Sequence, residues 1–397
     1  MMNQVRKPTA AWRRDAVRLS HGSESGTSSV VQVGLARVLA AIGLAAVVPA
    51  SAAAPSPTQH GAQKVSPNAT YVVRGIDVRA HRMYIEDTTY GALRQSDDWG
   101  KTFSSDKGLP PTVTSVEKVV RFKSRIYLFG RNDQTRVGGV YSAVPTPGDD
   151  PLEWAGPTIT LAPPIGFLPT DLSADSRFLY LGEYGNPPGG PTLWRSRDGK
   201  HWQNVFGPAA GIRHIHAVAP DPYHPGDVWM TVGDGVPVSI WRSRDYGARG
   251  SWRVVVHSSR WQSVQISFTS RRIYLAADTH GATFFVLDRK TLLPALGTPQ
   301  YFHTIRPPGG PPSSRYLWNA FFGAVDPSTG VYYCVANDES SPSSPAGGSW
   351  GGWFAVRRLG GPVTILDPGG PTFSANGEVF VGGGRVWAGE WFVPELH

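Results

Sequence analysis

The chain has 397 residues, 17% of them charged, and its 46 glycines, 35 prolines and many short apolar runs favour an all-β fold of one large or two ordinary domains. The formal net charge is +8, but residues 1–54 hold six of the 38 basic and two of the 30 acidic residues, so the remainder carries +4. A charge this mild and dispersed argues against nucleic acid as a partner and is compatible with an acidic glycan.

The N-terminal segment predicts export. The run of small apolar residues at 34–54 includes Arg37, is preceded at a distance by Arg13, Arg14 and Arg18, and ends in Ala50-Ser51-Ala52. This order of charged, apolar and small-x-small residues predicts a secretory signal peptide cleaved after Ala52, and the run is short for a membrane span. We therefore expect a secreted protein without stable membrane insertion; an uncleaved N-terminal anchor is the alternative.

A turn motif, Ser-x-Asp followed by glycine and an aromatic residue, recurs along the chain. It reads SDDWGKTF at 96–103, SRDGKHW at 196–202 and SRDYG at 243–247, and Ser142 begins a degraded copy. Serine and aspartate side chains accept hydrogen bonds from turn amides, and glycine takes a positive φ. The serines are 46, 54 and 47 residues apart, a period typical of the four-stranded blades of a β-propeller.

A second pattern supports this fold. Seven apolar segments end in acidic residues and are expected to be the second strands of successive blades: RMYIED at 82–87, RIYLFGRND at 125–133, FLYLGEY at 178–184, DVWMTVGD at 227–234, RIYLAAD at 272–278, GVYYCVANDE at 330–339 and RVWAGEW at 385–391. We predict seven four-stranded blades, with six as the alternative. The predicted organisation is a signal peptide with an N-terminal extension (1–54), a linker (55–65) and a propeller (66–397), the last blade being completed by residues near 65–75.

The single cysteine, Cys334, lies in the apolar run VYYCVAN. One cysteine can form neither an internal disulfide nor a multi-cysteine metal site, so we expect an inert, buried strand residue. Stability must then come from sheet packing and from closure of the ring of blades.

The turns resemble the Asp-box, or BNR, repeat of sialidase-like β-propellers. The segments GEYG, RHIHAVAPDPY and W-x-x-x-GD, with RWQSVQISF and RIYLAAD after them, are similar to secreted bacterial BNR-repeat proteins described as glycosyl hydrolase-like or sialidase-like. The similarity covers residues 178–280 well and the rest of the chain only through the repeat pattern. It implies an extracellular glycan as the substrate class.

Ionisable residues are densest between 183 and 234. In a propeller all second strands lead to the same face, so their acidic ends should surround one mouth of the central funnel. His214 and His216 open an innermost strand and alternate with Ile215, which places both imidazoles on one side. Such a pair can bind a metal, act as general acid and base, or hold a carboxylate; a hydrogen-bonded core pair is the alternative.

We name two sets of candidate residues at this mouth. The catalytic candidates are Glu183, Tyr184, His214, His216 and Asp234. The substrate-binding candidates are Arg213, Trp261, Asp278, His280, Trp318 and Asp338. No cofactor motif is present, and a structural or catalytic divalent metal in the funnel remains open.

The first functional hypothesis is a glycoside hydrolase, with Glu183 and Asp234 as the carboxylate pair that flanks the scissile bond. The second is a polysaccharide lyase, by analogy with other seven-bladed propellers that cleave uronate-containing glycans with His or Tyr and Arg. The third is a propeller that binds carbohydrate or protein without catalysis, because a fold alone does not give a function. In each case we expect a monomer.

Overall fold

The computed structural model describes the backbone of residues 63–65, 70–209, 211–234, 238–258, 261–279, 282–295, 300–301, 318–338, 353–359, 363–366, 378–389 and 391–394. The predicted signal peptide and His280 lie outside these residues. The described residues belong to a unit that spans Pro57–His397. Among them, no helix has the length and the apolar run that crossing a bilayer requires.

The described part of the N-terminal half forms antiparallel sheets in chain order. The first contains β2 (Tyr71–Asp77), β3 (Arg82–Asp87) and β4 (Ala92–Ser96); the second contains β5 (Ser115–Phe122), β6 (Arg125–Arg131), β7 (Gly138–Ala143) and β8 (Ala155–Leu161). The third contains β10 (Leu172–Ala174), β11 (Leu179–Gly182), β13 (Leu193–Ser196) and β14 (Trp202–Phe206). A 3-10 helix, η1 (Pro169–Asp171), precedes β10, and β9 (Ile165–Gly166) pairs with β12 (Tyr184–Gly185) as a two-stranded ribbon.

The remaining described strands repeat the same order. One sheet contains β15 (His214–Pro220), β16 (Val228–Gly233), β17 (Ser239–Ser243) and β18 (Arg253–His257), and the next contains β19 (Ser263–Phe268), β20 (Arg272–Ala277), β21 (Ala282–Asp288) and β22 (Gln300–Tyr301). After these come β23 (Trp318–Val325), β24 (Val331–Asp338), β25 (Trp353–Arg358) and β26 (Val363–Leu366). The last sheet contains β27 (Val379–Gly382), β28 (Arg385–Ala388), β29 (Trp391–Pro394) and β1 (Gln63–Lys64).

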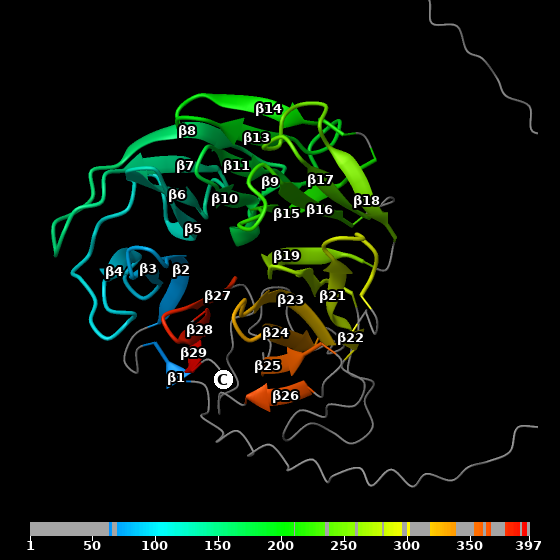
Figure 1. Cartoon of the computed structure of the whole chain (residues 1–397). Helices are drawn as coiled ribbons and strands as arrows, with labels where there is room; N and C mark the ends of the chain where they lie inside the picture. The colour runs from blue at the N-terminus through cyan, green and yellow to red at the C-terminus, as the bar shows by residue number, and fades with distance from the viewer. Residues whose placement is uncertain are drawn as a thin grey trace, which may run out of the picture. The chain divides into compact units, whose positions relative to one another are not determined.

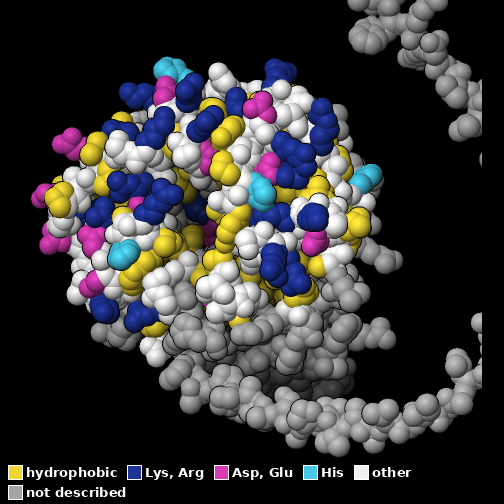
Figure 2. Space-filling view, in the orientation of Figure 1, with side chains coloured by type: hydrophobic (Ala, Val, Ile, Leu, Met, Phe, Trp, Pro, Cys, Tyr) yellow, Lys and Arg dark blue, Asp and Glu magenta, His cyan; other side chains and the backbone are white. Residues whose placement is uncertain are grey.

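The first strand of each sheet faces the centre of a ring (Figure 1). Contacts run from β2 to β5, β10, β15, β19, β23 and β27 in turn, and β27 contacts β2 again. The all-β, β-propeller prediction is therefore confirmed. One face of the ring is hollowed near its centre and carries many lysine and arginine side chains (Figure 2). A cavity of about 270 Å³ is lined by residues of four innermost strands and by the contacting ion pair of Lys118 and Glu378.

The expectation of seven four-stranded blades is wrong as stated. In the described part of the chain six sheets have four strands, but the β2–β4 sheet has three. The segment after β4 does run beside it, since Ser104 N donates to Gln95 O at 2.8 Å and Lys107 N donates to Leu93 O at 2.7 Å. In return, Gln95 N donates to the hydroxyl oxygen of Ser104 at 3.0 Å, so a side chain takes the place of a backbone acceptor in the ladder.

Both ends of the chain build the last sheet. Gln63 pairs with Phe392 and Lys64 with Trp391, so β1 forms its outer strand. This strand lies inside the segment expected to be a linker, so the propeller begins before residue 66. Residues near 65–75 were expected to complete the last blade. The strand that does so is β1, which lies just before them in the sequence.

The apolar core lies between the sheets. Each cluster of buried side chains combines residues from neighbouring sheets; one joins Tyr84 and Leu93 to Val116 and Ile126, and another includes Trp229 and Phe285. Fully burying a large apolar side chain contributes about 1.5–3 kcal/mol, so these seams supply much of the stability. Cys334 is buried on β24, as expected.

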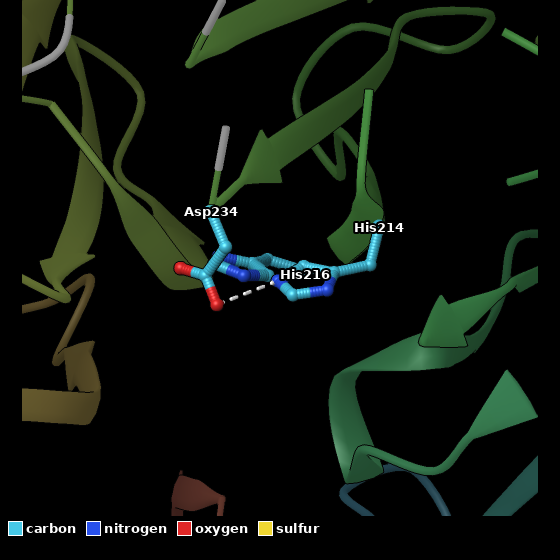
Figure 3. A group of neighbouring side chains, drawn as sticks. All are labelled: His214, His216 and Asp234. Carbon is cyan, nitrogen blue, oxygen red and sulfur yellow. Dashed lines mark ion pairs between the residues drawn. The ribbon is translucent and has the colours of Figure 1, made fainter. Parts of the chain in front are cut away.

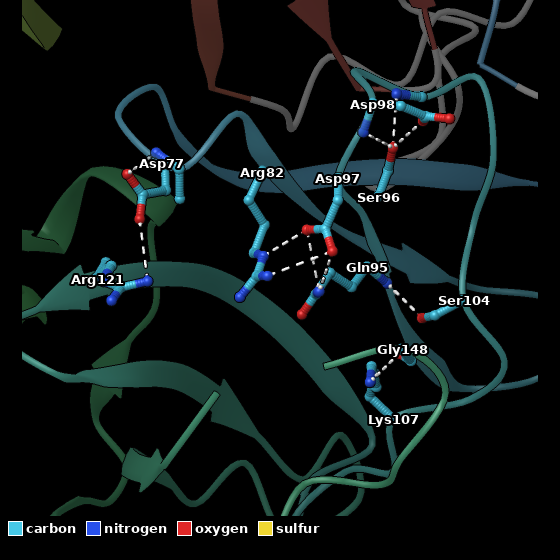
Figure 4. A network of polar contacts seen from close by, with 12 residues as sticks. Asp77, Arg82, Gln95, Ser96, Asp97, Asp98, Ser104, Lys107, Arg121 and Gly148 are labelled. Atoms are coloured by element: carbon cyan, nitrogen blue, oxygen red, sulfur yellow. Dashed lines mark hydrogen bonds and ion pairs between the residues drawn. The ribbon is translucent and has the colours of Figure 1, made fainter. Parts of the chain in front are cut away.

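The Ser-x-Asp turns have the predicted chemistry (Figure 4). Ser96 Oγ accepts a hydrogen bond from Gly100 N at 2.7 Å, and Asp98 Oδ1 accepts bonds from Lys101 N and Thr102 N at 3.0 and 2.9 Å. The second copy repeats this pattern, with Gly199 N bonded to Ser196 Oγ. Gly100 has φ +78°, which glycine adopts without strain.

We predict that Asp98→Ala lowers the free energy of unfolding by about 1–3 kcal/mol, because the turn amides lose a charged acceptor. Burial would raise the pKa of Asp98, but the hydrogen bonds from Thr102, Ser96 and Lys101 outweigh it and lower the pKa to about 2. The contribution is therefore complete above the unfolded pKa near 4 and is lost as the pH falls toward 2. Urea unfolding at pH 7 and pH 3 measures it.

The neighbouring Asp97→Ala is the control, because Asp97 forms an exposed ion pair with Arg82 that contributes about 0–1 kcal/mol. Equal losses in the two variants would show that the turn hydrogen bonds are not the stabilising element.

Candidate functional site

The site lies where β15 begins and β16 ends. The two strands are antiparallel, so His214 pairs with Gly233 and Asp234 follows directly. The register shifts between Ile215 and Ala217, which makes His216 the extra residue of a bulge. The two imidazole rings nevertheless stack, with centroids 4.6 Å apart and planes at 25°. Both rings thus lie together as the sequence predicted, but the cause is a bulge and not the regular alternation of side chains along a strand.

Asp234 is the carboxylate closest to His214 (Figure 3). His214 Nε2 lies 3.1 Å from Asp234 Oδ2, and the His214 side chain is 3% exposed against 32% for Asp234. The contact is not aligned as a hydrogen bond, so the buried Nε2 has no hydrogen-bond partner in the described part of the chain. The contact with His214 lowers the pKa of Asp234 to about 2, and Asp234 is ionised at neutral pH.

His216 is held in one orientation. Its Nδ1 lies 3.2 Å from the carbonyl oxygen of Ser263, which can only accept, so Nδ1 carries the proton. A Cβ on Gly233 would lie 2.1 Å from the ring, so glycine is required there. Burial, reinforced by His214, lowers the pKa of His216 to about 3, and the neutral ring therefore presents a lone pair at Nε2.

Tyr184 covers the histidine pair. Its ring centroid is 4.4 Å from that of His214 and 6.0 Å from that of His216. It is placed by the ribbon of β12 and β9, where it packs against Gly166. Burial, then the charges of Asp234, Asp171 and Asp278, raises the pKa of Tyr184, so the phenol keeps its proton at neutral pH.

Two further polar groups join the site from the next sheet. The amide of Gln262 contacts both Asp234 and Asp278, and Asp278 Oδ2 lies 3.9 Å from His216 Nδ1. At the rim, Arg213 is 54% exposed and its guanidinium is 3.6 Å from Asp234 Oδ2. The structure thus brings together Tyr184, Arg213, His214, His216, Asp234 and Asp278.

Glu183 has a different environment. Its Oε2 accepts a hydrogen bond from Thr192 N at 2.9 Å and its Oε1 accepts one from Trp194 Nε1 at 2.8 Å. Its backbone oxygen accepts a bond from Ile215 N, which links two sheets. Both carboxylate oxygens are therefore engaged within the fold, on the sheet that precedes the histidine strand.

One of the other candidates, Trp261, lies away from the cluster. Trp261 was named as a substrate-binding candidate, but it is 8% exposed and stacks on Phe285 at 4.9 Å in a core seam, which corrects that expectation. Trp318 and Asp338 are paired across β23 and β24, and their side chains lie outside the described residues, as does His280.

Two residues near the site were not predicted. Gln262 immediately precedes an innermost strand, as Arg213 does one sheet earlier, and this repeated position could have identified it. Asp171 lies in η1 and is fully buried; its Oδ2 accepts a bond from Leu168 N at 2.8 Å, but Oδ1 has no described partner. Nothing in the local sequence of Asp171 indicates burial.

No protein-family model matches the chain, and no curated protein matches it. Solved structures do match in fold. The extracellular domain of a hybrid two-component system from B. thetaiotaomicron is 11% identical over 85% of this chain, with a TM-score of 0.51, and a puromycin hydrolase is 12% identical over 82%, with a TM-score of 0.50. The chain spans 40% and 50% of these two proteins, and the likeness shows the propeller fold alone.

We predict that Asp171→Asn makes stability less dependent on pH. Burial, and then the charge of Glu183, raises the pKa of Asp171 well above its ordinary value. The protonated carboxyl therefore stabilises the fold fully below the unfolded pKa near 4, and this contribution is lost as the pH rises through the folded pKa. The parent chain should therefore lose stability between pH 4.5 and pH 7.5, and the variant should lose less over the same range.

Urea unfolding at the two pH values measures the change, and Asp106→Asn, which replaces an exposed carboxylate, is the control. If both variants keep the pH dependence of the parent chain, Asp171 is ionised in the folded protein.

Proposed function

We propose that this propeller is a secreted enzyme that cleaves an acidic glycan at the rim formed by Arg213, Tyr184 and Asp234. The observation that carries the proposal is the exposure of the Arg213 guanidinium beside the carboxylate of Asp234, which contacts His214 under the Tyr184 ring. A guanidinium at such an edge can bind a sugar carboxylate through paired hydrogen bonds. The many basic side chains on the face in Figure 2 favour an acidic ligand as well.

The buried histidines cannot act on the glycan directly. His214 and His216 are both 2% exposed, too little to touch a sugar ring. They are positioning residues, since His214 contacts Asp234 and both rings pack under Tyr184. The groups that reach the substrate are therefore Arg213, Tyr184 and Asp234.

Elimination is the reaction that these groups support best. Arg213 neutralises the sugar carboxylate, which acidifies the proton on the adjacent carbon. Asp234, ionised at neutral pH, accepts that proton; the electron pair forms the double bond, the bond to the glycosidic oxygen breaks, and Tyr184 donates a proton to the leaving oxygen. The engagement of both Glu183 oxygens favours elimination over the hydrolysis that pairs Glu183 with Asp234.

Hydrolysis is the second candidate, and a specific contact favours it. Asp234 and Asp278 both contact the amide of Gln262, so two carboxyl groups lie close together at the mouth. A glycosidase needs such a pair on either side of the scissile bond. We keep this sialidase-like or hydrolase-like reaction as the alternative. Secretion through the predicted signal peptide is part of the proposal in either case.

We predict that Arg213→Ala, Tyr184→Phe and Asp234→Asn each reduce glycan cleavage by about 10²-fold or more, a range typical of lost acid–base or charge-stabilising groups. The assay follows reducing ends and ultraviolet absorbance with uronate-containing and neutral polysaccharides. Elimination raises both signals because its product is unsaturated, whereas hydrolysis raises reducing ends alone.

Arg244→Ala is the matched control, because this exposed arginine lies after β17, at the far end of the strands from Asp234. Cleavage that survives all three rim substitutions would place the chemistry elsewhere. Saturable binding of the glycan without either product signal would support the non-catalytic alternative.

A further inference from the structure

Three side chains of the site bring possible metal-ligand atoms close together. One ring nitrogen of His214, one ring nitrogen of His216 and one carboxylate oxygen of Asp234 all lie within 4.8 Å of one another. In Figure 3 the two rings and the carboxylate lie together. We propose that these residues bind one divalent transition-metal ion. The inference uses the residues of the proposed function, but it does not depend on a glycan being the substrate.

The hydrogen bond of His216 prepares it as a ligand. Imidazoles that bind metals usually donate the other ring N–H to a carbonyl or carboxylate, which fixes the tautomer. His216 Nδ1 has this bond, to the carbonyl of Ser263 at 3.2 Å, and no described group bonds to its Nε2. The absence of a side chain on Gly233 allows the ring to lie in this place. A lone pair is thus held in a fixed direction inside the protein.

His214 supplies an independent observation. Its Nε2 is buried, has no hydrogen-bond partner in the described part of the chain, and lies 3.1 Å from Asp234 Oδ2. A buried polar atom without a partner is costly to the fold. An ion between Nε2 and Oδ2 would satisfy both atoms, and Asp234, 32% exposed, provides the side from which an ion can enter.

The charge around the three residues also favours a cation. Asp234 and Asp278 both face the histidine pair, and Gln262, which contacts both carboxylates, is neutral. Arg213, the nearby cation, is half exposed, and its guanidinium lies 3.6 Å from Asp234 Oδ2, farther than His214 Nε2. Two imidazoles and one carboxylate suit zinc or a similar first-row ion, whereas calcium and magnesium prefer oxygen ligands alone.

The test is zinc binding to the purified full chain after chelator treatment and dialysis, measured by isothermal titration calorimetry. We expect one zinc ion per chain, no comparable binding of calcium, and at least about tenfold weaker zinc binding in His216→Gln and His214→Gln. His201→Gln is the control, because His201 lies in a Ser-x-Asp turn with its side chain 87% exposed, and it should bind zinc as the parent chain does.

Cobalt gives a second measurement that does not use activity. Co²⁺ bound by nitrogen and oxygen ligands should give visible absorption bands that Zn²⁺ displaces and that the two His variants lose. If a His variant does not fold, as judged by circular dichroism, Asp234→Asn replaces it, since that side chain is a third exposed. No saturable zinc binding, or equal binding in the His216 and His201 variants, would overturn the inference.

The outcome also separates this inference from the proposed function. If the ion binds, Asp234 becomes a ligand and another group must accept the proton in elimination. Zinc binding without glycan cleavage would retain the metal site and refute the glycan proposal, whereas glycan cleavage by a protein that shows no saturable zinc binding would retain the proposed function and overturn the metal site.

Discussion

Apolar packing between neighbouring sheets is the constraint on which the rest of the structure depends. Each sheet is narrow, and in the described part of the chain its buried side chains lie in clusters shared with an adjacent sheet. A sheet that buries its faces only against its neighbours has no stable arrangement alone, so the units must form a closed ring. The polar ends of the strands are then left at the two faces, where loops are free to carry chemistry.

The site follows from this arrangement together with one irregularity. The contact between β12 and β15 brings Tyr184 and the histidines together although about 30 residues separate them. The bulge at His216 then interrupts the regular alternation of side chains along β15, and the two imidazole rings stack. The second carboxylate, Asp278, comes from the next sheet, so the site is assembled across three sheets by the same packing that closes the ring.

The repeat pattern was enough to predict the fold class and the second strands, because strand periodicity and turn chemistry are local properties. All seven predicted second-strand segments contain a strand next to the innermost one of its sheet. The same reasoning predicted the position of the histidine cluster. It could not predict that Glu183 is engaged by Thr192 and Trp194, that Trp261 is buried, or that Asp171 has an unpartnered oxygen, because these depend on contacts between distant segments.

The pairing of β1 with β29 connects the order in which the chain is synthesised to the stability of the fold. Gln63 and Phe392 are partners across almost the whole length of the domain, so the last sheet cannot form until Phe392 has been synthesised. Contacts this distant in sequence slow folding, and the earlier sheets must persist for that time with an open edge. Loss of either end, by proteolysis or truncation, would expose the edge of a strand to pairing with another molecule. The pairing of β1 with β29 therefore keeps this strand edge covered.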